Sequence, residues 1–156
     1  MPETKDKLQE LADIKDDNTG DLRMFFENFV KPGVVVKERE VAPGFTVKLK
    51  ALSTGELMQA ESLVYGAQGV PNDIVVKVRS ASILSQSILS VNGIDIEQGE
   101  NEKDNRVRRS FLYKKLLDMP PYVVQQAYEL YIEAVRDQNN IYQNKDHETE
   151  EKIENF

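Results

Sequence analysis

The chain contains no cysteine and a single histidine. Without cysteine, disulfide bonds, thiolate catalysis and thiolate metal sites are excluded, and the composition fits a reducing compartment. The one histidine, His147, lies between Asp146 and Glu148 near the C-terminus. The predicted folded part therefore contains no imidazole that could serve in a serine triad or a histidine-based metal site. A role for His147 as a metal ligand stays open. We predict a protein that is not an enzyme and that holds no metal or cofactor.

Long apolar runs and phosphate-binding glycine patterns are also missing. No run approaches the roughly 18 residues of a membrane-spanning helix, and no basic start followed by an apolar stretch marks a secretory signal. The glycines are scattered and match neither Gly-x-Gly-x-x-Gly nor Gly-Lys-Ser/Thr. We expect a soluble, cytoplasmic protein without membrane contact or nucleotide hydrolysis. Carboxylate chemistry stays open as an alternative, with Asp95 and Glu97 as the candidates.

The net charge of -7 lies at the two ends of the chain. Residues 1–21 carry three lysines and seven acidic residues, and residues 139–156 carry two lysines and five acidic residues, whereas the middle is neutral. Acidic ends of this kind either stay solvated as tails or become ordered when they bind a basic partner. We therefore predict an acidic N-terminal segment (1–21), a single domain (22–138) and an acidic C-terminal tail (139–156), with both ends flexible.

A short apolar helix is predicted over residues 21–30. Its apolar side chains recur at the spacing of one helical face: Leu22, Phe25, Phe26, Phe29 and Val30. A helix of this length is not stable alone, so the face must be covered. Two interpretations stay open: the face packs on the protein's own domain, or the phenylalanines anchor a neighbouring subunit.

The clearest strand signal lies in residues 34–51. Phe45, Val47 and Leu49 alternate with polar residues that face the other way, and a Pro-Gly pair precedes them as a turn signal. We predict a β-hairpin with one buried face. Because a hairpin alone is only marginally stable, it should pack on helices or extend the sheet of a partner. Val34 and Val36 are the edge residues that we expect such a partner to contact.

Helices are predicted over most of the remaining chain. Ser53 and Glu56 have the spacing of a capping box and begin a helix that runs to about residue 65. The next helix, residues 74–90, has apolar residues most of the way round and is therefore expected to be central. Asn92-Gly93 then predicts a tight turn with a second short β element.

Two more helices complete the predicted domain. Asp104 is expected to cap a helix that runs to about Leu117. Pro121 opens the last helix, which is expected to end at about Gln138, because proline is tolerated where the first N–H would be unpaired. The fold class is therefore α+β, with the hairpin of residues 34–51 packed on a bundle of four to five helices.

A basic group on the Asp104 helix is the main electrostatic feature of the predicted domain. It comprises Arg106, Arg108, Arg109, Lys114 and Lys115. On the outer face of a helix these residues can form a solvated surface, pair with an acidic protein surface that includes the protein's own tails, or neutralise phosphates. Acidic residues adjoin the group and no nucleic-acid motif is present, so nucleic acid is the least favoured of the three.

Five segments follow one another within about residues 41–135: 45–50 (FTVKLK), 52–57 (LSTGEL), 88–95 (ILSVNGID), 116–124 (LLDMPPYVV) and 128–131 (YELY). Taken in this order, they resemble small tail proteins of tailed bacteriophages, namely the baseplate hub or tail-assembly chaperone proteins. The resemblance implies a virion tail component or an assembly factor in the host cytoplasm, and it transfers no catalytic residue.

Together these features predict a non-enzymatic structural or assembly protein of a phage tail or baseplate. Its expected partners are other tail or baseplate proteins, and a homo-oligomer is a further alternative. The partner-binding residues are predicted in three groups: Phe25, Phe26 and Phe29; Val34 and Val36; and Arg106, Arg108 and Arg109. The alternative is a small regulatory nucleic-acid-binding module that uses the helix from Arg106 to Lys115.

Overall fold

The computed structural model describes residues 20–65, 69, 71–98 and 100–154, with the backbone alone for Pro32, Leu63, Tyr65 and 144–154. The chain divides into two compact units, Met1–Val34 and Val35–Phe156. The described residues hold five α-helices and one four-stranded antiparallel sheet, which confirms the predicted α+β class. Most of the predicted acidic N-terminal segment, and the side chain of His147, lie outside the described residues.

The described part of the first unit is a helix followed by a tight turn. Helix α2 spans Gly20–Val30. Asp21 lies in its first turn, where a negative charge interacts favourably with the helix dipole. The 3-10 helix η1, Lys31–Gly33, follows it directly and contains the proline that an α-helix would not continue through. The predicted helix over residues 21–30 is therefore present.

The second unit contains the sheet, whose strands follow one another in the order β1-β2-β3-β4. The strands are β1 (Val36–Ala42), β2 (Phe45–Lys50), β3 (Ile88–Val91) and β4 (Ile94–Asp95). Strands β1 and β2 form the predicted hairpin within residues 34–51, and the turn between them includes Gly44 at a φ of 77°. Such a positive φ suits glycine because it carries no Cβ.

Two turns at one end of the sheet are joined by a single side chain. Asn92 and Gly93 both have positive φ, 51° and 78°, as the tight turn predicted for this pair requires. The Asn92 side chain accepts a hydrogen bond from the backbone N–H of Thr46 at 2.8 Å and donates one to the carbonyl of Gly44 at 2.9 Å. The β3–β4 turn therefore fixes the β1–β2 turn next to it.

The alternation predicted for the hairpin is confirmed by burial. Val47 and Leu49 are fully buried, whereas Lys48 between them is exposed. In the register of the sheet Lys48 pairs with Glu38, so these opposite charges share the outer face. The inner face packs against helices, which is how a marginal hairpin becomes part of a stable domain.

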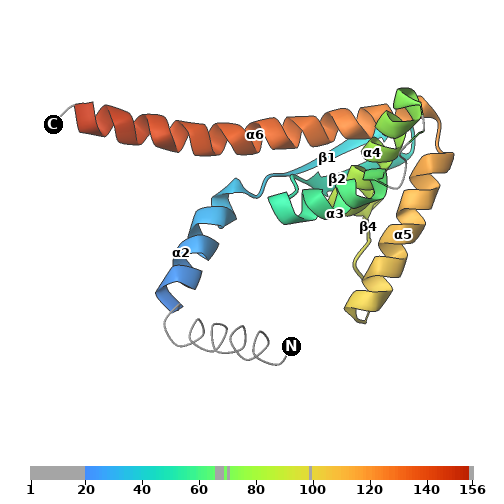
Figure 1. Cartoon of the computed structure of the whole chain (residues 1–156), viewed down its shortest axis with the longest axis horizontal. Helices are drawn as coiled ribbons and strands as arrows, with labels where there is room; N and C mark the ends of the chain where they lie inside the picture. The colour runs from blue at the N-terminus through green and yellow to red at the C-terminus, as the bar shows by residue number, and fades with distance from the viewer. Residues whose placement is uncertain (1–19, 66–68, 70, 99, 155–156) are drawn as a thin grey trace. The chain divides into compact units, whose positions relative to one another are not determined.

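The second unit has four helices, α3 (Thr54–Tyr65), α4 (Asn72–Ser87), α5 (Glu102–Asp118) and α6 (Pro121–Glu154). Helices α4 and α6 make the main contacts with the sheet, whereas α3 and α5 pack on α4 (Figure 1). Helix α4 packs on α3, α5, α6 and β2, so its predicted central position is confirmed. Its buried half is rich in small residues, and the hydroxyls of Ser82 and Ser85 donate to the backbone carbonyls of Ala60 and Ser82.

Three predicted helix boundaries were wrong. The helix predicted over 74–90 ends at Ser87, because Ile88 pairs with Leu49 as the first residue of β3. Helix α5 is capped by Asn101, whose side chain accepts from the N–H of Asp104 at 3.0 Å, so Asp104 is not the cap. Helix α6 does not end at Gln138 but continues to Glu154.

Candidate interaction surfaces

Helix α2 carries a continuous apolar face whose side chains are about half exposed. The face, called here the α2 stripe, consists of Leu22, Phe25, Phe26, Phe29 and Val30, which are each 47–59% exposed. None of the helix's residues is buried. An amphipathic helix is normally stabilised by packing this face against another element. The three predicted anchor residues Phe25, Phe26 and Phe29 thus lie together on one open surface.

The phenylalanine rings of the α2 stripe pack on one another. The Phe25 ring is stacked on Phe29 at 5.9 Å between centroids and meets Phe26 edge-on at 5.5 Å. Such contacts fix the rings as a group, which lowers the conformational entropy lost when a partner covers them. Glu27 and Lys31 border the stripe and form a shallow hollow with Phe26 and Val30.

The two predicted edge valines are exposed and lie at the start of the sheet. Val34 is 48% exposed and ends the first unit, and Val36 is 44% exposed and begins β1. Between them, the carbonyl of Val35 accepts a hydrogen bond from the N–H of Ala51 at 3.1 Å. The edge strand β1 has a run of charged residues from Lys37 to Glu40, a composition that disfavours pairing with a further strand.

Arg109 is not a surface residue, contrary to the prediction for the basic helix. It is only 9% exposed, and its Nη1 donates to the carbonyls of Ser85, Gln86 and Ile88 at 2.8–3.2 Å. Its Nε and Nη2 both donate to Glu97 Oε1, at 3.1 and 2.9 Å. The guanidinium therefore satisfies carbonyls at the C-terminal end of α4, where positive charge also complements the helix dipole.

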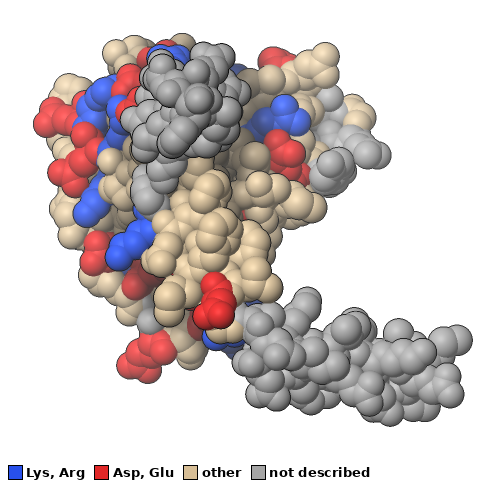
Figure 2. Space-filling view, turned by 90° about the vertical axis from the view of Figure 1, so that its left-hand side faces the viewer, with Lys and Arg blue, Asp and Glu red and all other residues tan. Residues whose placement is uncertain are grey.

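The remaining cations of α5 do not form one open basic surface. Arg108 donates to the carbonyls of Ile96 and Asp95, the latter at 3.2 Å, while Arg106 is exposed. Lys115 lies over the Phe111 ring, with its Nζ 5.3 Å from the ring centroid. Figure 2 views the molecule from the side away from α5, and there acidic and basic side chains are interspersed. These contacts weaken the nucleic-acid alternative.

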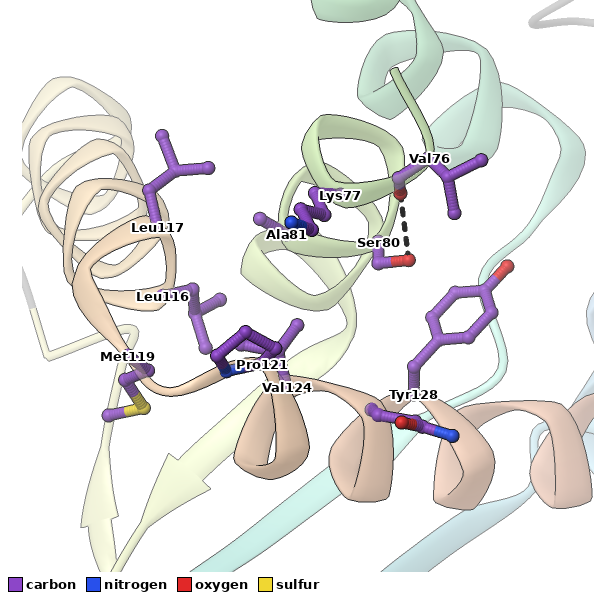
Figure 3. Close-up of a pocket in the computed structure, with 11 residues that line it drawn as sticks. Val76, Lys77, Ser80, Ala81, Leu116, Leu117, Met119, Pro121, Val124 and Tyr128 are labelled. Atoms are coloured by element: carbon purple, nitrogen blue, oxygen red, sulfur yellow. Dashed lines mark hydrogen bonds between the residues drawn. The ribbon is translucent and has the colours of Figure 1, made fainter. Parts of the chain in front are cut away.

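An apolar groove lies between α4, the end of α5 and the start of α6 (Figure 3). It encloses about 660 Å³. Leu116 and Ala81 form its buried base, and exposed Val76 and Leu117 stand on opposite sides. Tyr128 rises from α6 toward α4 at one end (Figure 3). Lys77 is the one charged residue among those that line it.

Sequence reasoning missed this groove. The signals that could have indicated it are Leu116-Leu117 followed by Pro120-Pro121, which turns the chain from α5 into α6, and the many apolar positions of α4. Because α4 is apolar most of the way round, it is expected to be central, yet Val76 in its N-terminal half is 59% exposed. Only the packing of the three helices shows which of these residues meet.

Ion pairs fasten α6 to the edge strand β1. The Arg39 guanidinium donates to both carboxylate oxygens of Glu133, at 3.0 and 2.8 Å, and Lys37 pairs with Asp137 at 2.7 Å. The hydrogen bonds from Arg39 hold the pKa of Glu133 below its ordinary range, with Lys37 and Arg136 adding to the effect. These side chains hold α6 on the edge of the sheet.

No carboxylate site emerges in the described part of the chain. Glu97, one of the two candidates, is engaged with Arg109, and Asp95 lies on the exposed strand β4. Among the residues that the structure describes, no group of three or more His, Asp or Glu residues is placed to hold a metal ion. The same residues include no helix that is both long and apolar enough to cross a membrane.

Comparisons with known proteins found no relatives. No protein-family model, curated protein or solved structure matches the chain.

Proposed function

We propose that this protein is a non-enzymatic docking protein that works in assembly, with α2 as its anchor for another protein. The observation that carries the proposal is the α2 stripe. Five large apolar side chains of an 11-residue helix lie on one face, and none is buried. Buried aromatic anchors supply most of the binding energy of protein interfaces, and three phenylalanines together are of that type.

Tail or baseplate assembly in a tailed bacteriophage is the setting that we propose for this docking. Its support is the resemblance of residues 41–135 to small tail proteins, together with the scarcity of groups for polar catalysis. The partners are then other tail or baseplate proteins, and the protein acts in the virion tail or in the host cytoplasm during assembly. Presence of the protein in mature particles would identify a structural component, whereas its absence would identify a transient chaperone.

The test of the anchor is the double variant Phe25→Asp, Phe29→Asp. Wild-type protein is expected to co-elute with one of the candidate tail proteins, and the double variant is expected to lose that co-elution. Thermal unfolding of the second unit should stay unchanged, because the substituted side chains are exposed and belong to the first unit. A double variant that unfolds like a core mutant would show that the stripe is internal core.

Met24→Asp is the matched control for this test. Met24 lies on the same helix and is 62% exposed, but it points away from the α2 stripe. It introduces one helix-weakening aspartate into the same helix, and thus half of the charge that the double variant adds. Co-elution should survive in Met24→Asp. If the control abolishes binding as completely as the double variant, the loss of binding comes from weakening the helix and not from the stripe. A wild-type protein that binds none of the tail proteins contradicts the proposal.

The nucleic-acid alternative has its own measurement. Gel retardation of DNA and RNA at low salt is expected to show no complex, since Arg108 and Arg109 are engaged within the fold. A complex that forms and weakens steeply with added salt would favour the alternative.

A further inference from the structure

The side of α5 that faces away from the domain combines apolar and basic side chains. This side, called here the α5 face, consists of Lys103, Val107, Phe111 and Lys114, which follow one another at the spacing of one helical face. Val107 and Phe111 are each 61% exposed, and both lysines are exposed as well. The buried residues of the helix lie on its opposite side. The α5 face is therefore an apolar pair with a positive charge at either end.

The charges of the α5 face are available to a partner. In the part of the chain that the structure describes, neither Lys103 nor Lys114 forms an ion pair. Lys115 lies beside the face with its Nζ over the Phe111 ring, so it adds a third cation next to the apolar pair. The chemistry that this face recognises is thus an acidic surface that also offers an apolar contact.

The C-terminal end of α6 has the complementary sequence. Asp146, Glu150 and Glu154 recur at every fourth residue, which is the spacing of one helical face, and Ile153 falls on the same face. Because α6 continues to Glu154, the segment that carries these residues is helical. The acidic positions span about 12 Å at the rise of an α-helix, and the two lysines of the α5 face are about 16 Å apart by the same measure. The two surfaces therefore match in charge and in length.

The end of α6 cannot reach the α5 face of its own chain. Helix α6 has 34 residues, so it is about 50 Å long, and it leads away from α5 (Figure 1). Phe111 is at most about 22 Å from the start of α6, counted along the rest of α5 and the short link between the helices. Glu154 therefore stays more than about 25 Å from Phe111 within one chain. Only the α5 face of another copy is within its reach.

We infer that the acidic C-terminal end of α6 docks on the α5 face of a second copy of this chain. The inference goes beyond the proposed function, because it uses neither α2 nor a tail protein. The contact joins two different surfaces and is therefore heterologous, so it builds a ring or a filament unless two copies exchange their helix ends reciprocally. An apolar pair with a few exposed ion pairs is a small contact, so association should be weak, in the micromolar to millimolar range.

Sedimentation velocity of the full chain measures this association. The average mass is expected to rise with protein concentration at low salt. Added salt should lower the mass, because exposed ion pairs are screened once the Debye length falls to about 10 Å at 0.1 M salt. The net charge of -7 makes two chains repel, and screening of that repulsion alone would raise the mass instead. A strictly monomeric chain, or an association that strengthens with salt, would overturn the inference.

Charge reversal on either side should weaken the contact. Lys103→Glu with Lys114→Glu changes the α5 face, and Glu150→Lys with Glu154→Lys changes the end of α6. Each pair should raise the dissociation constant about tenfold or more, because like charges then face each other. The urea denaturation midpoint of the α5 pair should stay unchanged, since both lysines are exposed. Association that either pair leaves unchanged would place the contact elsewhere and overturn the inference.

Lys48→Glu with Lys77→Glu is the matched control for the α5 pair. Both residues are exposed lysines outside the α5 face, and their reversal changes the net charge by the same amount. The control should associate like the wild type. Phe111→Ser tests the apolar part without a change of charge, and it should also weaken association, because the ring is the largest apolar group of the face.

Mixing the two reversed pairs gives the sharpest result. Alone, each variant sets like charges against each other at the contact and should stay monomeric. In the mixture, the basic helix end of one variant meets the acidic α5 face of the other, and the unchanged surfaces also meet, so a complex of both chains should form. Because both variants remain net negative, general attraction between them would not produce this complex. A mixture that stays monomeric would contradict the inference.

Three further results would overturn the inference. If the control pair weakens association as much as the α5 pair, net charge and not the α5 face decides it. If Phe25→Asp with Phe29→Asp abolishes association, the contact belongs to α2. If DNA or RNA is retarded through Lys103 and Lys114 while the wild-type chain alone stays monomeric, the α5 face takes a nucleic acid. Co-elution of α2 variants with tail proteins tests the proposed function separately, so the two failures are distinguishable.

Discussion

Replacing Arg109 with methionine should destabilise the second unit more than the same change at either of the other two arginines of α5. Methionine keeps most of the side chain's length and apolar stem but removes all five hydrogen bonds of the guanidinium, three to backbone carbonyls and two to Glu97. The carbonyls of Ser85 and Ile88 would lose a buried partner, and water cannot easily replace it at a site where Arg109 is 9% exposed.

The expected loss is about 3–5 kcal/mol in the free energy of unfolding, the cost of removing one partner from a buried charged network. The lower half of that range is favoured because Glu97 is more than half exposed and stays hydrated once its partner is gone. A loss of about 4 kcal/mol lowers the melting temperature by roughly 10–15 °C in a chain of this size. Urea denaturation followed by circular dichroism measures the change, with the slope of the transition expected to stay constant.

Two neighbouring arginines provide the controls. Arg106→Met removes an exposed charge and should change stability by no more than about 0.5 kcal/mol. Arg108→Met removes hydrogen bonds to two carbonyls at a half-buried position and should cost about 1 kcal/mol. An Arg109→Met variant that loses less than about 1 kcal/mol, or no more than Arg106→Met, would refute the view that Arg109 holds α4, α5 and Glu97 together.

Further changes test local features of the second unit by the same denaturation assay. Ser53→Ala should cost about 1 kcal/mol, because its hydroxyl accepts from the N–H of Glu56 at 3.3 Å in a reciprocal capping box. Gly93→Ala should cost about 1–2 kcal/mol, since its φ is 78°, whereas Gly55→Ala at a helical position with free space should stabilise by about 0.5–1 kcal/mol. The lowered pKa of Glu133 means that its contribution to stability is present above the unfolded pKa of about 4.3 and is lost as the pH falls through the folded value. Glu133→Gln should therefore flatten the acidic limb of stability against pH, and an unchanged limb would contradict this.

Local chemistry made several elements predictable from the sequence. The capping box at Ser53 and the Asn92-Gly93 turn depend on side chains within a few residues, so their geometry follows from the sequence whatever surrounds them. The alternation through Val47 and Leu49 is likewise local, because successive strand residues point to opposite faces. The boundary at Ser87 was missed because Ile88 becomes a strand residue only through pairing with Leu49, far away in the sequence.

The candidate surfaces divide in the same way. The sequence by itself determined the α2 stripe, since the spacing of Phe25, Phe26 and Phe29 places them on one face of any helix they form. Only the tertiary structure decided that Arg109 turns inward and that Val76 and Leu117 border one groove. The physical reason is that burial depends on which elements meet, and α5 meets α4 through contacts that no local pattern encodes.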